Sequence, residues 1–209
     1  MDRRAQIAVS AALALGVLTA YVWWRRHAND SAEAAIDSEP ARAVVEGGVV
    51  MSFKLSSTGF RHEGDIPAKH TCEGGDVAPA LAWSMAPPNT KSFALIVDDP
   101  DAPDPKAPRT TWVHWVLYDL PPTAASLPEG AARASLPPGT HEGKNDWKQP
   151  GYRGPCPPIG KHRYYFKLYA LDVVLPELNQ PSKAALERAM EGHVIGQATL
   201  MGYYQKAGK

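Results

Sequence analysis

The chain has 209 residues, enough for one domain with a sizeable hydrophobic core and an additional segment. Lys and Arg together number 22, as do Asp and Glu, so the sequence lacks the excess of positive charge typical of nucleic-acid-binding domains, and no nucleic-acid partner is expected. The 20 prolines and 17 glycines interrupt the chain often, which favours strands and ordered loops over long helices.

Residues 1–26 contain an uncharged run, Ala5–Trp24, that is long enough to span a bilayer as a helix. The pair Trp23–Trp24 at its end suits the interface between membrane and water. The run therefore predicts a transmembrane anchor. A cleaved signal peptide and a soluble amphipathic segment are the alternatives, although Leu18-Thr19-Ala20 lacks the small residue that a cleavage site needs.

Residues 27–50 are rich in Ala and acidic residues and contain no aromatic residue, which predicts a flexible tether. Basic residues flank the apolar run on both sides, so their distribution alone does not orient it. The short N-terminal tail and the long C-terminal part favour a membrane-anchored protein whose domain is exported to the periplasmic side.

The folded domain is expected to comprise residues 51–209, beginning with a strand in which Phe53 and Leu55 alternate with polar residues. The cysteines, Cys72 and Cys156, do not form the close pairs that a zinc site needs, and no metal site is expected from them. In an exported domain they are about as consistent with one long-range disulfide as with two buried thiols.

Further along the chain, runs of β-branched and aromatic residues predict strands at Ser92–Asp98, Trp112–Asp119, Tyr164–Val173 and Ile195–Tyr204. One helix is predicted late in the chain, with Ser182 as its N-cap, Gly192 at its end, and an apolar stripe that comprises Ala185, Leu186, Ala189 and Met190. Many short strands with few helices favour a mainly β protein, specifically a β-sandwich with peripheral helices.

Common catalytic motifs are missing from the sequence: it contains no Walker A loop, no GxGxxG, no GxSxG and no HExxH. Three segments are nevertheless hard to explain by packing alone. Carboxylates cluster directly after a strand in Asp98–Pro103, and mutual repulsion means that at least one needs a positive or donor partner. An acidic, proline-stiffened turn is the simpler interpretation of this segment.

The second segment is Trp112–Tyr118, where His114 lies in the middle of a strand and needs hydrogen-bond partners if it is buried. The simpler interpretation is a buried core histidine whose hydrogen-bonding groups are satisfied by its neighbours. The third is Gly151–Tyr164, whose glycines and prolines form a stiff loop before Lys161, His162 and Arg163. Such a loop can present backbone N–H groups and cations to an anion, or it can be a rigid surface loop with solvated charges.

The stretches DDPDAP, WVHWVLYDLP and GPCPPIGKHRYYFKLYALD resemble the phosphatidylethanolamine-binding protein family, in particular its bacterial branch, often called Raf kinase inhibitor-like. The similarity continues through Cys72–Trp83, Gly143–Asp146, Ala189–His193 and Leu200–Tyr204, and so covers residues 51 to 205. This resemblance implies an antiparallel β-sandwich with a few peripheral helices, a C-terminal helix, and a small pocket that takes phosphate, acetate or a phospholipid head group. It also makes a homodimer plausible.

Carried over to this sequence, the resemblance predicts a ligand-binding pocket formed by Asp99, Asp101, His114, Pro158, His162 and Tyr164. Two histidines could each donate to an oxyanion, with an Asp behind them to fix the tautomer. We therefore expect a binding protein for a small anionic group that needs no cofactor, and modulation of a protein partner is a further role consistent with this expectation. The alternatives are a hydrolase of phosphate or acyl esters that uses the same Asp and His residues as general acid and base, and a metal site at His114, His162 and Asp99.

Overall fold

The computed structural model describes residues 52–132 and 135–207. The predicted anchor (1–26), the tether (27–50) and the location inferred from them lie outside the described residues and stay predictions. Within the described ranges, we find no helix with the length and apolar character needed to cross a bilayer.

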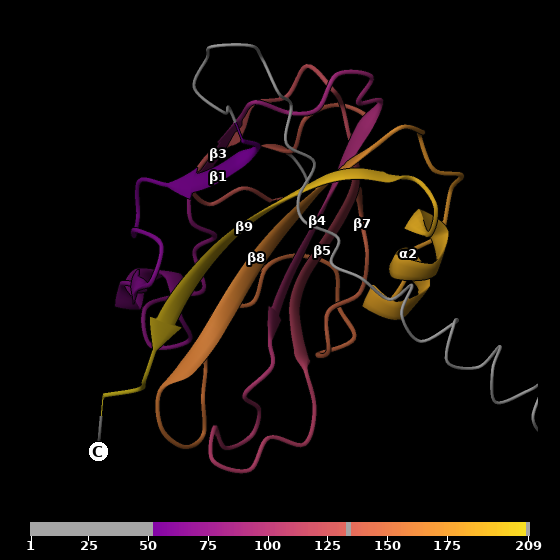
Figure 1. Cartoon of the computed structure of the whole chain (residues 1–209). Helices are drawn as coiled ribbons and strands as arrows, with labels where there is room; N and C mark the ends of the chain where they lie inside the picture. Colours follow the sequence, from indigo (N-terminus) through magenta and orange to yellow (C-terminus); the bar gives the residue numbers. More distant parts are fainter. Residues whose placement is uncertain (1–51, 133–134, 208–209) are drawn as a thin grey trace, which may run out of the picture. The chain divides into compact units, whose positions relative to one another are not determined.

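The described chain is mainly β, as predicted (Figure 1). Its elements in chain order are β1 Lys54–Ser57, β2 Gly64–Asp65, the 3-10 helix η1 Ala68–His70, β3 Leu81–Ser84, β4 Ser92–Asp99, β5 Trp112–Leu120, β6 Ser126–Leu127, β7 His141–Glu142, β8 His162–Leu171, α2 Lys183–Met190 and β9 Val194–Tyr204. They form a three-stranded sheet in the order β1-β3-β6 and a six-stranded sheet in the order β2-β9-β8-β4-β5-β7.

The four long strands β4, β5, β8 and β9 lie close to the positions that the sequence predicts. Strand β4 is central in the large sheet, and all eight of its residues are buried. This explains its nearly continuous apolar run, since a strand that is covered on both faces does not alternate. Strand β8 instead alternates buried and more exposed positions from His162 to Ala170, because only one of its faces points into the main core.

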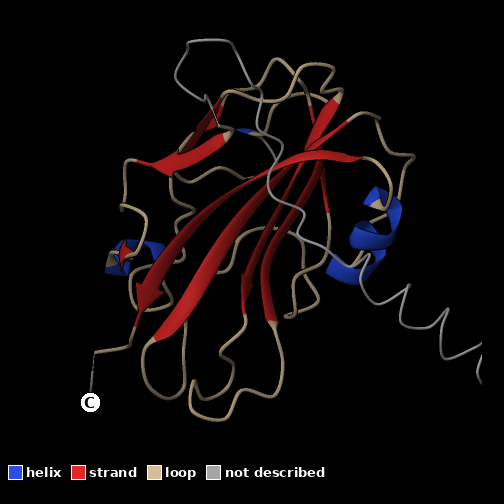
Figure 2. Ribbon diagram, in the orientation of Figure 1, coloured by secondary structure: helices blue, strands red, loops and turns tan. Residues whose placement is uncertain are grey.

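The two faces of the large sheet pack against different elements (Figure 2). On one face, Phe93, Leu95 and Trp115 share a core with residues of the small sheet such as Leu81 and Trp83. On the other face, a second cluster includes Ile96, Val116 and Tyr118 from β4 and β5 together with Leu186 and Met190 from α2. Successive residues of one strand therefore belong to different cores.

Helix α2 follows the predicted signals. Ser182 is its N-cap, and the Ser182 hydroxyl accepts a hydrogen bond from the N–H of Ala185 at 3.3 Å. Leu186 and Met190 are its buried residues, and Gly192 follows with a φ of 79°, a conformation that glycine adopts without strain.

Two parts of the predicted fold need correction. The predicted antiparallel sandwich is not confirmed, because the sheets are open and the six-stranded one is mixed, with β2 pairing in parallel with β9. Strand β2 has only two residues, Gly64 and Asp65, and no sequence pattern announces such a short edge strand. The helix is also not C-terminal, since β9 follows it and fills the sheet between β8 and β2.

Candidate functional site

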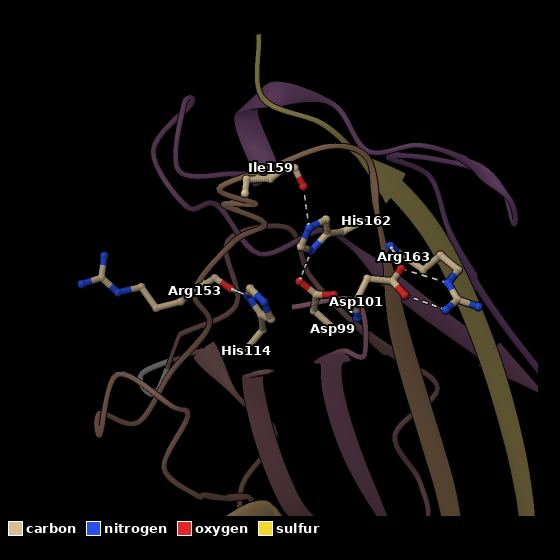
Figure 3. A network of polar contacts seen from close by, with 7 residues as sticks. All are labelled: Asp99, Asp101, His114, Arg153, Ile159, His162 and Arg163. Atoms are coloured by element: carbon tan, nitrogen blue, oxygen red, sulfur yellow. Dashed lines mark hydrogen bonds and ion pairs between the residues drawn. The ribbon is translucent and has the colours of Figure 1, made fainter. Parts of the chain in front are cut away.

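The predicted site residues gather at one end of the large sheet, where β4 ends and both β5 and β8 begin. Asp99 pairs with Trp112 across β4 and β5, and Asp98 pairs with Tyr165 across β4 and β8. Because antiparallel neighbours bring the end of one strand beside the start of the next, the acidic turn, His114 and His162 meet at this edge (Figure 3).

His114 is 2% exposed and is oriented by a backbone carbonyl. Its Nδ1 lies 2.6 Å from the carbonyl oxygen of Arg153, and a carbonyl only accepts, so Nδ1 carries the proton (Figure 3). Its Nε2 is buried and has no hydrogen-bond partner among the residues that the structure describes. Burial lowers the pKa of His114, while the Arg153 carbonyl and the Asp99 carboxylate oppose this effect more weakly. The ring is therefore neutral near pH 7, with a lone pair on Nε2.

His162 is fully buried, and both of its ring nitrogens have partners. Nδ1 lies 2.7 Å from Oδ2 of Asp99, and Nε2 lies 2.9 Å from the carbonyl oxygen of Ile159 (Figure 3). The other oxygen of Asp99 accepts the N–H of Asp101 at 2.8 Å. The expectation that both histidines can donate to a ligand therefore needs correction: in this structure both nitrogens of His162 already contact protein acceptors.

Asp101 is paired with Arg163, the second residue of β8. Its carboxylate accepts from Nη2 of Arg163 at 2.6 Å, and from Nε and the backbone N–H of the same residue at 2.9 Å. The hydrogen bonds from the Arg163 side chain are the main reason why the pKa of Asp101 lies below its usual value. Lys161, the other cation of this segment, pairs with Asp65 at 2.6 Å. The two cations that this loop was predicted to present to an anion, Lys161 and Arg163, are therefore paired with carboxylates of the protein.

Tyr164 lies between the two histidines. Its ring is 5.3 Å from that of His114 in an edge-on arrangement and 6.3 Å from that of His162 in a stacked one. Its buried hydroxyl has no hydrogen-bond partner of normal geometry within the described part of the chain, but it lies close enough to Asp99 to interact with that carboxylate. Burial, and then the nearby Asp99 carboxylate, raise the pKa of Tyr164, so the hydroxyl stays protonated. Pro158, the remaining predicted site residue, is exposed.

The loop that holds the Arg153 carbonyl is fastened to the 70–77 segment. Cys72 and Cys156 form a disulfide with a Cα–Cα distance of 5.5 Å. Asp76 accepts from the N–H of Gly154 at 2.9 Å and from Nη1 of Arg153 at 3.1 Å. Only glycine fits at 154, because a Cβ atom there would lie 2.3 Å from the backbone oxygen of His70.

Sequence reasoning missed several contributors to this site: the Arg153 and Ile159 carbonyls and Trp147, whose ring lies 5.2 Å from that of His114. It named Arg163 as a cation for an anionic ligand, but not as the partner of Asp101. A carbonyl acts through the backbone and leaves no mark in the residue type. The only sequence signal for Trp147 was its place directly after Gly143–Asp146, one of the stretches that resemble the family.

Two further features of the described residues bear on metal binding and on other ligand sites. Across residues 52–132 and 135–207, no group of three or more His, Cys, Asp or Glu side chains is arranged to hold a metal ion. A shallow cavity of about 570 Å³ lies between α2 and β9, lined by residues that include Tyr169, Glu187, Arg188 and Val194. Tyr169 is seven residues along β8 from His162, or roughly 23 Å, so this cavity is separate from the predicted site.

Comparison with known proteins agrees with the motifs. A model of the phosphatidylethanolamine-binding protein family matches residues 56–205. A UPF0098 protein of Methanothermobacter thermautotrophicus is 46% identical over 155 residues, which cover 74% of this chain and 99% of that protein. A UPF0098 protein of Chlamydia muridarum is 44% identical over 154 residues, with 74% and 99% covered.

Two solved structures are also similar. A putative phosphatidylethanolamine-binding protein homologue from Chlamydia trachomatis has a TM-score of 0.68 at 42% identity, covering 75% of this chain and 99% of that one. YbcL of Escherichia coli, described as a member of the mammalian family, has a TM-score of 0.69 at 32% identity, covering 75% and 100%. This chain therefore belongs to the phosphatidylethanolamine-binding protein family.

Proposed function

We propose that the domain is a binding protein for a small anionic group, such as a phosphate or a phosphate-bearing head group, and that the ligand contacts His114 and Tyr164 at the end of the large sheet. The observation that carries this proposal is a pair of buried polar atoms, His114 Nε2 and Tyr164 Oη, without hydrogen-bond partners of normal geometry in the described ranges. We call these two atoms the site atoms.

Unsatisfied buried polar atoms are costly, at about 1–3 kcal/mol each, and native proteins retain few of them. The rings of His114 and Tyr164 contact each other. The Arg153 carbonyl fixes the orientation of the His114 ring, and strand β8 holds Tyr164 in position. A ligand that supplies hydrogen bonds to both atoms would offset this cost. The family to which the chain belongs is named for binding phosphatidylethanolamine, which supports a ligand of this class.

The site atoms are covered in this structure, so a ligand has to displace part of their cover. Trp147 packs edge-on against His114 and is only half-buried, as is Trp112, whose ring lies 5.4 Å from that of Trp147. Trp147 therefore covers one side of the His114 ring, and Trp112 packs against Trp147. Binding is therefore expected to change the environment of tryptophan.

The geometry supports the hydrolase alternative less well than the binding function. Nε2 of His114 has a free lone pair that could act as a general base, but Asp99 and Ile159 hold both nitrogens of His162, so no second imidazole is free to act as the general acid. Both cysteines of the chain are joined in the disulfide, so no thiol is available as a nucleophile.

The test is a calorimetric titration with methyl phosphate at pH 6.5, followed in parallel by tryptophan fluorescence. We expect His114→Ala to weaken binding by about tenfold or more, since loss of one charge-assisted hydrogen bond is worth about 1.5–3 kcal/mol. His193→Ala is the matched control, because His193 is exposed and pairs with Asp172 beyond the helix. If the wild type shows no binding, or if folded His114→Ala binds as the wild type does, the proposed function is wrong.

A further inference from the structure

The shallow cavity between α2 and the start of β9 has an apolar side and a charged side (Figure 1). Its apolar side includes Tyr169, Met190 and Val194, and Val194 is 43% exposed, whereas most large apolar side chains of the domain are buried. Its charged side includes Glu187, Arg188 and Glu191. An apolar surface that is rimmed by charges can bind another segment of protein. We call this cavity the α2–β9 groove.

The charges of the groove are mostly unpaired within the described ranges. Glu187 has Lys183 as its ion-pair partner, but at 3.6 Å, while the same lysine approaches Asp98 to 2.6 Å. Arg188 and Glu191 have no ion-pair partner in the part of the chain that the structure describes. The groove therefore offers two carboxylates and one guanidinium to an occupant.

The described chain begins close to this groove. Phe53 stacks on Phe93 with 6.1 Å between the ring centroids. The Phe53 ring also approaches Gly196, where an added Cβ atom would lie 3.6 Å from Cδ1 of Phe53. Gly196 is two residues along β9 from Val194, or roughly 7 Å. The chain that precedes Ser52 is therefore attached next to the groove.

The sequence before Ser52 has a composition that suits the groove. The stretch Arg42–Val50 reads RAVVEGGVV, and its valines can supply apolar contacts to Val194 and Met190. Its two charged residues have opposite signs: Arg42 can pair with the carboxylates of the groove, and Glu46 with the guanidinium. Apolar and charged groups of the segment thus match those of the groove.

The length of the segment and its attachment both permit this contact. The stretch between Ser52 and Arg42 can extend over roughly 35 Å, whereas α2, with eight residues, is about 12 Å long. A segment attached so close to its binding site has an effective concentration on the order of millimolar. A contact that would be weak between separate molecules is therefore sufficient.

We propose that Arg42–Val50 binds in the α2–β9 groove of its own chain, with its valines against Val194 and Met190 and with Arg42 facing the carboxylates of α2. This contact would shorten the predicted tether from residues 27–50 to residues 27–41. The groove and the predicted ligand site are at opposite ends of β9, because Tyr204 at the end of this strand pairs with His162. The proposal is therefore independent of the proposed function.

The test is photo-crosslinking in the full chain. Val194 is replaced by the photoreactive residue benzoylphenylalanine, which is tolerated at an exposed position, and Ala184 on the α2 side of the groove gives a second probe position. Val174, which is 61% exposed and does not line the groove, is the control position. Trypsin cleaves after Arg42 and Lys54, so residues 43–54 form one peptide in which mass spectrometry locates the crosslink.

We expect both groove probes to crosslink to residues 43–50 of the same chain, and the Val174 probe to give no such product. Val45→Asp should lower the yield about tenfold, because it removes the burial of one valine side chain. Glu191→Gln should lower it about twofold, the effect of one exposed ion pair. Ala34→Asp, in the tether but outside the segment, should leave the yield unchanged.

Mixing isotope-labelled and unlabelled chains identifies the occupant. Crosslinks that join labelled to unlabelled chains would show that the groove binds a second copy, and the proposal would be wrong. The proposal also fails if neither groove probe reaches residues 43–50, if the Val174 probe reaches them equally well, or if Val45→Asp leaves the yield unchanged.

Discussion

At the scale of single residues, the contact between Asp99 and His162 is central to the structure of the site. Asp99 also accepts the N–H of Asp101, so the same carboxylate orients the histidine and closes the acidic turn. Asp99 stabilises this region either through its negative charge or through the geometry of its hydrogen bonds. Substitutions that preserve shape but not charge distinguish them.

We expect Asp99→Asn to lower the free energy of unfolding by about 1 kcal/mol or less, because its amide oxygen can accept from Asp101 while its N–H donates to Nδ1 of a neutral His162. Asp99→Ala removes both contacts at a buried position and should cost about 3–5 kcal/mol. Urea unfolding at pH 7.5 measures both values, with Asp104→Asn in the neighbouring loop as the control. Equal losses for the two Asp99 variants would show that charge, and not hydrogen-bond shape, is what matters.

At the scale of elements, the docking of α2 on the large sheet depends on a buried carboxylate as well as on apolar packing. Asp98 is fully buried at the end of β4. Lys183 at the start of α2 approaches Oδ2 of Asp98 to 2.6 Å, and Lys167 from β8 lies 2.9 Å from both carboxylate oxygens. One acidic side chain thus joins a helix and two strands.

Because either lysine can neutralise Asp98 by itself, we expect the two lysines to be coupled. Lys183→Met or Lys167→Met alone should cost about 1–2 kcal/mol, while the double variant should cost at least 1 kcal/mol more than the sum, because it leaves a buried carboxylate without a cation. Guanidinium chloride unfolding of the four proteins of this cycle gives the coupling energy. Strictly additive losses would mean that the lysines stabilise the protein independently of Asp98.

At the scale of the whole domain, the disulfide joins segments that are far apart in the sequence. Cys72 and Cys156 are separated by 84 positions, and the bond connects the 70–77 segment to the loop that carries the Arg153 carbonyl. Asp76, through Gly154 and Arg153, adds hydrogen bonds between the same two segments. The bond is therefore expected to affect both global stability and the position of His114.

Replacing both cysteines in Cys72→Ser/Cys156→Ser should lower the free energy of unfolding by up to about 4 kcal/mol, the value of closing a loop of this length in the chain-entropy model. It should also weaken methyl phosphate binding severalfold at a temperature where the variant is folded, because the Arg153 carbonyl is less firmly held. Chemical unfolding and calorimetry provide the two values. A variant as stable as the wild type would rule out a stabilising role for the disulfide.

The sequence by itself determined the elements whose signal is local. The long strands, the helix after Ser182 and its apolar stripe follow from periodicity and capping, because the side chains of one strand or helix turn decide them. The family, and with it the set of site residues, followed from motifs that lie in order along the chain. In the structure, the aspartates, the histidines and Tyr164 of this set lie at one edge of the large sheet, whereas Pro158 is exposed.

Only the tertiary structure decided which of these side chains remain available to a ligand. Nothing in the residue types indicates that Arg163 neutralises Asp101, that the Ile159 carbonyl completes the contacts of His162, or that the Arg153 carbonyl turns the lone pair of His114 inwards. The parallel direction of β2 was likewise beyond prediction. The physical reason is the same in each case: a backbone carbonyl, a strand direction and a charge partner depend on contacts between segments that are distant in sequence, and no single segment encodes such a contact.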